Sequence, residues 1–148
     1  MSRMVNVIAG GTLLVLTCLA HAGNDAGLVK VVKGRVTIER GEQKLAATSG
    51  EKVLVSDRVL TGANSSVGIT LRDGTLLSAG QNSELHLNKF AFDSTTNNGE
   101  LDATLKRGTL AVLSGKLSKS SPSAVTYRTP TAILGVRGTE FVVEAGEN

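Results

Sequence analysis

The sequence has no tryptophan, one tyrosine, three phenylalanines and a single cysteine among 148 residues. With so few aromatic rings, a core must be filled by Val, Leu, Ile and Ala, which suit short strands that pack against one another. The shortage also argues against single-stranded nucleic acid as a ligand, because bases stack on aromatic side chains. The lone cysteine excludes an intramolecular disulfide, so stability has to come from packing and backbone pairing.

Neither sign of charge dominates the chain. Lys and Arg together number 16 against 13 Asp and Glu, a formal net charge of +3. The bases are scattered singly apart from Lys106-Arg107, whereas a nucleic-acid surface needs clustered bases. We therefore expect no nucleic-acid partner.

The N-terminus has the pattern of a secretory signal peptide. Arg3 is followed by an apolar run over residues 7–19, and Ala20-His21-Ala22 supplies the small residues that a signal peptidase requires. This predicts a helical signal peptide over residues 1–22, a mature start at Gly23 and a periplasmic or secreted protein with no membrane span after cleavage. An uncleaved membrane anchor is the alternative, although a spanning helix needs about 20 apolar residues.

Cys18 lies inside this segment and leaves a second alternative open, a lipoprotein that is anchored through an acylated cysteine. Thr17 precedes it at a position where the lipidation motif prefers Gly, Ala or Ser. If cleavage follows Ala22 instead, as we expect, the mature chain has no cysteine and no thiol nucleophile.

Residues 23–148 are of a size for one domain. Apolar and polar residues alternate in many short stretches, the period-two pattern of half-buried strands. These stretches include residues 36–38, 53–55, 67–71, 85–87 and 101–105. Gly50, Gly62 and Gly74, spaced by twelve residues, suggest a repeated strand-turn unit. We predict an all-β fold of short stacked strands in a twisted β-solenoid or roll-like domain, with a β-sandwich as the alternative.

Turns and loops separate the expected strands. Asp73-Gly74 and Asn98-Gly99 are strong turn signals, because these residue types accept the positive φ of a tight hairpin. The polar tracts 93–98 and 114–123 are expected to be exposed, mobile loops.

The stretch over residues 127–143, YRTPTAILGVRGTEFVV, combines a proline with two glycines that flank Val136 and Arg137. Pro130 fixes its own φ and favours extended geometry before it, which predicts a turn or a sheet edge. Arg137 either contacts a partner or uses its five donors to satisfy backbone carbonyls at a crowded corner. We favour the structural role, and Arg128 is a second candidate for the same two roles.

No arrangement of side chains points to catalysis or to a cofactor. His86 is the only histidine beyond residue 22, and zinc recruits several His or Cys ligands, so we expect a surface or edge histidine. Residues 108–116 match a phosphate-binding loop only loosely, since Leu117 follows the lysine where Ser or Thr is required. We predict a protein that is not an enzyme and has no cofactor.

The acidic residues give no metal site or acid-base pair either. Asp57, Asp73 and Asp93 are isolated, and the calcium-binding nonapeptide of some solenoids is absent. Glu140 and Glu144 share one face of an expected strand, with nothing to suggest a raised pKa. We expect no structural metal.

Four stretches together resemble the FecR-type domain family of periplasmic sensors. They are VSDRVLTG (55–62), residues 67–87, KRGTLAVLSG (106–115) and residues 127–143, and the resemblance spans roughly Gly34 to Val143. Its most specific elements are TPTAILGVRGT (129–139) and Asp73-Gly74 followed by Asn82-Ser83. The resemblance implies an all-β, solenoid-like fold and a part in passing a signal from an outer-membrane transporter to a sigma factor.

The chain differs from the membrane-spanning regulators of that family, because its hydrophobic segment is at the extreme N-terminus. We therefore expect a freestanding exported module that is non-catalytic and docks another envelope protein at a strand edge or sheet face. Recognition of cell-wall glycan or polysaccharide is the alternative, which the few aromatic side chains disfavour. An envelope hydrolase is a third hypothesis, which the absent catalytic groupings disfavour.

Overall fold

The computed structural model describes residues 25–137 and 140–146. The expected signal peptide with Cys18 lies outside these residues, as do Gly138 and Thr139 of the C-terminal motif. The strands are β1 (Asp25–Lys33), β2 (Val36–Arg40), β3 (Gln43–Ala46), β4 (Lys52–Leu54), β5 (Arg58–Thr61), β6 (Ser66–Leu71), β7 (Leu76–Ala79), β8 (Glu84–Phe92), β9 (Gly99–Leu113), β10 (Val125–Arg128), β11 (Ile133–Gly135) and β12 (Glu140–Ala145). Two short helices are α1 (Leu117–Ser120) and η1 (Pro122–Ala124). The predicted all-β class is confirmed.

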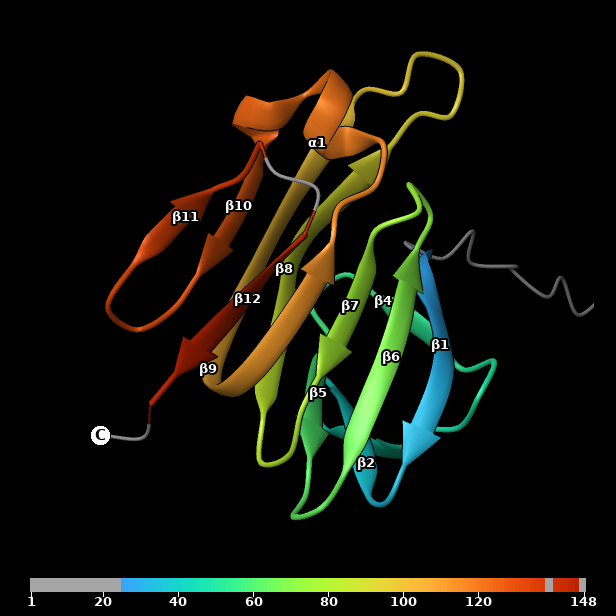
Figure 1. Cartoon of the computed structure of the whole chain (residues 1–148). Coiled ribbons are helices and arrows are strands. Elements are labelled where there is room, and N and C mark those ends of the chain that lie inside the picture. The colour runs from blue at the N-terminus through green and yellow to red at the C-terminus, as the bar shows by residue number, and fades with distance from the viewer. Residues whose placement is uncertain (1–24, 138–139, 147–148) are drawn as a thin grey trace, which may run out of the picture.

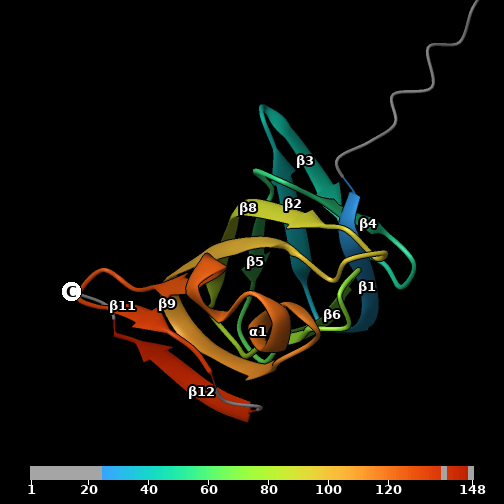
Figure 2. The same ribbon diagram turned by 90° about the horizontal axis from the view of Figure 1, so that it is seen from above.

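The strands form one sheet that curls into an open half-barrel (Figures 1 and 2). We call its two halves the front sheet, ordered β4-β1-β6-β7-β9-β12, and the back sheet, ordered β3-β2-β5-β8-β9-β10-β11. Neighbouring described strands are antiparallel except β9 and β10, which are parallel. The finer descriptions, a solenoid-like roll and a sandwich, remain predictions.

Strand β9 belongs to both halves. Along one edge it pairs first with β8 and then with β7, and along the other edge first with β10 and then with β12. The change of sheet falls at Gly108, whose φ of +90° lies in the left-handed region that favours glycine. Among the described residues, no other strand pairs with members of both halves.

The core lies between the two halves and is mainly aliphatic, as the composition predicts. Alternate residues of each strand point inward, in keeping with the period-two pattern. Burial of each large aliphatic side chain contributes about 1.5–3 kcal/mol. The most buried large side chains include Leu77, Leu110 and Val112 from the front sheet and Ile38, Val59, Leu101 and Leu105 from the back sheet.

The tract 114–123 is not the exposed loop that the sequence predicts. Leu117 in α1 is fully buried, and Figure 2 shows α1 over the opening between the two halves. The Oδ2 atom of Asp73 accepts a hydrogen bond from the Leu117 amide at 3.2 Å, and the Asp73 carbonyl accepts one from the Lys116 amide at 2.9 Å. This contact joins residues far apart in the sequence, so the local pattern misses it. The tract 93–98 is a largely exposed loop between β8 and β9, as predicted.

A repeated corner does exist, but its spacing is not the twelve residues that the glycines suggested. Gly62-Ala-Asn-Ser65 and Gly80-Gln-Asn-Ser83 both turn through an asparagine in the left-handed region, with φ of 52° at Asn64 and 51° at Asn82. In each, the serine Oγ accepts an amide hydrogen from another strand or turn, Arg35 at 2.8 Å and Thr109 at 3.0 Å. The two corners therefore close the same end of the half-barrel in the same way.

Candidate binding surfaces

The C-terminal motif folds as the hairpin β10–β11 followed by β12. Tyr127 pairs with Leu134 in the hairpin. The turn contains Pro130: the Thr129 amide donates to the Ala132 carbonyl at 2.9 Å, and the Ala132 amide donates to Thr129 Oγ1 at 3.1 Å. The turn predicted at Pro130 is confirmed.

The two candidate arginines have different environments. Arg128 Nε donates to both carboxylate oxygens of Asp102, at 3.2 and 3.1 Å, and so ties β10 to β9. Arg137 follows β11, is exposed, and makes no hydrogen bond to any other described residue. Its guanidinium is therefore accessible, and both of its expected roles remain predictions.

Strands β11 and β12, which we call the C-terminal edge, are each paired on one side. Within the described residues β11 pairs only with β10 and β12 only with β9, which leaves unpaired N–H and C=O groups on the other side. A hollow of about 390 Å³ is lined by both strands and their neighbours: Leu134, Gly135, Val136, Arg137, Phe141 and Val142. Ile133 and Val142, 68% and 70% exposed, are the two most exposed large hydrophobic side chains among the described residues.

An aromatic pair holds the C-terminal edge in place. Tyr127 of β10 and Phe141 of β12 pack edge to face, with ring centroids 5.1 Å apart and planes at 70°. Tyr127 is buried, and this burial raises its pKa. The edge therefore presents a fixed surface rather than a loose tail.

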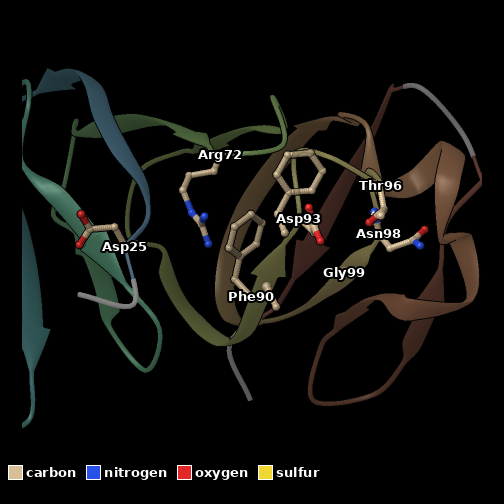
Figure 3. A pocket seen from close by; sticks show the side chains of 9 residues that line it. Asp25, Arg72, Phe90, Asp93, Thr96, Asn98 and Gly99 are labelled. Carbon is tan, nitrogen blue, oxygen red and sulfur yellow. The ribbon is translucent and has the colours of Figure 1, made fainter. Parts of the chain in front are cut away.

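A second hollow, a cleft of about 760 Å³, opens near α1. Figure 3 shows Arg72 reaching toward the Phe90 ring, with Thr96 and Asn98 on the side away from Asp25. The Arg72 guanidinium carbon lies 5.5 Å from the Phe90 centroid, a cation–π contact. Phe92 and Asp93 also line the cleft, so two of the three phenylalanines gather here. No sequence pattern indicates this cleft, because its residues come from three separate parts of the chain: Asp25, Arg72 and residues 90–99.

The residues considered for chemistry have structural surroundings. His86 Nε2 lies 2.7 Å from Glu84 Oε1 on the outer face of the back sheet, and this hydrogen bond lowers the pKa of Glu84. Residues 108–113 are part of β9, and their main chain pairs with β7 and β12 rather than forming a loop. In the described part of the chain, no three His, Cys, Asp or Glu side chains are grouped closely enough to hold a metal ion.

Asp57, which was considered from the sequence only as a possible metal ligand, forms an ion pair with an arginine. It is fully buried and accepts hydrogen bonds from Arg40 Nε at 2.9 Å, Arg40 Nη2 at 2.8 Å and the Leu54 amide at 2.8 Å. The pair raises the pKa of Arg40. Asp57 thus has a structural role in fixing β2 to the segment between β4 and β5.

Comparison with known proteins gives one match. A family model described as FecR protein matches residues 57–148, which include β5 to β12. No curated protein and no solved structure matches the chain. Within residues 25–137 and 140–146, no helix has the length and apolar character needed to cross a membrane.

Proposed function

The chain belongs to the FecR family, which is associated with signalling at the cell envelope and is not known as an enzyme family, and we propose that it is a non-catalytic periplasmic module that docks another envelope protein. The docking surface is the C-terminal edge. A partner segment in extended conformation adds to the unpaired side of β11 or β12 by main-chain hydrogen bonds. One apolar side chain of that segment fills the hollow beside Phe141.

The exposed Ile133 is the observation that carries this proposal. Edge strands of monomeric proteins usually carry charges, prolines or bulges that prevent further pairing. β11 has only three residues, and short length is one such device, but it presents Ile133 and Gly135, both exposed and uncharged. Arg137 stands at the end of this strand and supplies one cation, which would pair with an acidic group of the partner.

Crosslinking in cells tests the docking surface. A photoreactive amino acid at position 133 is expected to trap one envelope protein, and Ile133→Lys is expected to abolish capture of that same protein by the purified chain. Gln43, exposed on β3 at the opposite edge of the back sheet, is the matched control position. Equal capture through positions 43 and 133 would refute docking at the C-terminal edge.

Glycan recognition is a second candidate, and the cleft at Phe92 favours it. Sugar rings stack on aromatic side chains, and Asp93, Thr96 and Asn98 offer hydrogen-bonding groups beside them. The available ring surface is small, because Phe90 is only 7% exposed. Retention on purified peptidoglycan that is lost in Phe92→Ala would support this function, whereas retention unchanged by that substitution would count against the cleft.

A further inference from the structure

The outer face of the front sheet collects most of the exposed apolar side chains of the molecule. Among the described residues six large hydrophobic side chains are exposed, and all but Ile133 lie on this one face. These five are Leu28, Val31, Leu76, Leu113 and Val142, and they are 38% to 70% exposed. In Figure 1 the face points toward the viewer, and no helix or other strand lies in front of it. A gathering of this kind on one surface marks an interaction site.

Strand register arranges the face in rows that run across five strands, from β1 through β6, β7 and β9 to β12. One row is Val31, Gly68, Ser78, Ala111 and Val142, and the next is Leu28, Thr70, Leu76, Leu113 and Glu140. Only Glu140 among these ten residues is charged. The first row has small residues at its centre and a valine at each end, so another flat sheet could approach closely.

The third row carries opposite charges at its two ends. It begins with Lys33 on β1, continues through Ser66 and Thr109, and ends with Glu144 on β12. Lys33 and Glu144 are both exposed. Four strand spacings of about 4.8 Å separate β1 from β12, so the two side chains are about 19 Å apart and cannot pair within one molecule.

We propose that this face binds a second copy of the same chain, with a two-fold axis that runs parallel to the strands, over β7 and midway between the two facing sheets. This rotation lays β1 of one protomer over β12 of its partner and leaves each residue at the same height along the strands. Each Lys33 then meets the Glu144 of the other copy, and each Val31 meets the other Val142. The sheets pack in the aligned mode, about 10 Å apart.

The charges select this axis over the other possible one. A two-fold axis in the same plane but perpendicular to the strands would place β12 over β12, and Glu140 of each copy would face Glu144 of the other. Like charges in direct contact oppose association. The axis parallel to the strands pairs Lys33 with Glu144 and brings Glu140 opposite Leu28, so no two acidic residues of the three rows face each other, and the charges favour this orientation.

The area of the face indicates how tightly the two copies are expected to bind. Five strands of five to six residues cover roughly 24 by 18 Å, so two copies bury about 900 Å², close to the lower limit of about 1,000 Å² for specific interfaces. We therefore expect a reversible dimer with a dissociation constant in the micromolar range. The dimer covers the outer face of β12, including Val142, which also lines the hollow beside Phe141. The unpaired backbone sides of β11 and β12 lie outside this contact.

A charge swap tests the proposal. Sedimentation of the purified chain across a series of concentrations is expected to show a monomer–dimer equilibrium. Lys33→Glu and Glu144→Lys should each raise the dissociation constant by up to about tenfold, since each replaces two attractive contacts per dimer by repulsive ones. The combined variant, Lys33→Glu with Glu144→Lys, should return the constant to within about twofold of the original, because the pair is restored across the interface.

Two variants keep the test independent of folding defects. Val31→Lys and Ser78→Arg introduce charge at exposed positions in the middle row, and both are expected to give a monomer with an unchanged circular dichroism spectrum. A wild-type chain that stays monomeric at every concentration, or a combined charge variant no better than the single ones, would overturn the proposal. Val31→Lys should still capture the envelope partner and Ile133→Lys should still dimerise, so failure of this proposal and failure of the docking proposal are distinguishable.

Discussion

The outer faces of the two sheets are built from the same kind of alternating strands but differ in chemistry. The back sheet carries a ladder of charged and polar contacts: Lys44–Glu39 at 3.9 Å, Glu39–Arg58, Glu84–His86 at 2.7 Å, and Asp102 with Asn88 at 3.0 Å and with Arg128. The front sheet carries valines, leucines and small residues at the equivalent outward positions. Surface ion pairs contribute little to stability, so the difference has little effect on the fold itself. It is the basis of the proposal that the front face, and not the back face, binds a second copy.

Substitution of Gly108 is expected to have the largest effect on stability, because β9 passes from the back sheet to the front sheet at this residue. A Cβ atom at position 108 would lie 2.5 Å from Ser83 Cα, and the φ of +90° disfavours any other residue. We expect Gly108→Ala to lower the free energy of unfolding by about 3 kcal/mol or more, measured by urea denaturation. Gly74 has a similar φ of +88° but nothing within 4 Å of its added Cβ. Gly74→Ala should cost only about 1 kcal/mol, and an equal loss in both variants would show that the close approach to Ser83 is unimportant.

The next largest effect concerns the edge of the back sheet. Asp57→Ala removes the acceptor of the Leu54 amide and leaves the Arg40 guanidinium with the Lys52 carbonyl alone. We expect a loss of about 2–3 kcal/mol, because a partly buried charge and a buried donor both lose their partner. Asp93, an exposed carboxylate in the β8–β9 loop, is the control, and Asp93→Ala should change stability by less than about 1 kcal/mol. Similar melting temperatures for both variants would contradict the structural role of Asp57.

A third substitution removes one of the polar contacts on the outer face of the back sheet. Arg58 contacts Glu39 and lies opposite His86 in the β5–β8 pair. Arg58→Ala should lower stability by only about 0.5 kcal/mol, since the arginine is largely exposed. It should leave the dimer unchanged, whereas Leu113→Ser on the front sheet should weaken the dimer with a similarly small effect on monomer stability. Stability is measured by denaturation and dimerisation by sedimentation. If Arg58→Ala also gave monomers, the assignment of the dimer interface to the front sheet would be contradicted.

The smallest expected effect is a pH dependence of stability at the contact between His86 and Glu84. The hydrogen bond from His86 lowers the pKa of Glu84 in the folded chain, below its ordinary value of 4.5. The contact therefore stabilises the fold above pH 4.5, and this stabilisation is lost as the pH falls through the lowered folded pKa. The melting temperature of His86→Ala should fall below that of the wild type near neutral pH, and the gap should narrow in acid. A difference in melting temperature that stays constant as the pH is lowered well below 4.5 would contradict the lowered pKa of Glu84.

The sequence predicts where the strands and turns lie better than it predicts which strands pair with one another. Alternation at Val67, Ile69 and Leu71 correctly indicates β6, and Pro130 correctly indicates a turn. β1 was missed because the register shifts between Val29 and Val31, so apolar side chains point to both faces and the alternation is interrupted. Strand order, and with it the rows on the front sheet, depends on pairings between distant segments.

The surroundings of residues that contact distant parts of the chain could likewise not be predicted from the sequence. The burial of Leu117 follows from Asp73, which lies 44 positions earlier in the chain, and the role of Asp57 follows from Arg40, which lies 17 positions earlier. The two candidate arginines were identified from the glycines and proline around them, but only the structure separates them. Arg128 is paired with Asp102, whereas Arg137 is exposed at the C-terminal edge.

Because β9 is, among the described strands, the one that connects the front strands to the back strands through backbone pairing, the order of synthesis limits when the two halves can be joined. As the chain leaves the ribosome, or is threaded through an export channel from its N-terminal end, the first eight strands can make only two separate ribbons. The backbone pairing that joins the two ribbons is complete only when residue 113 has emerged.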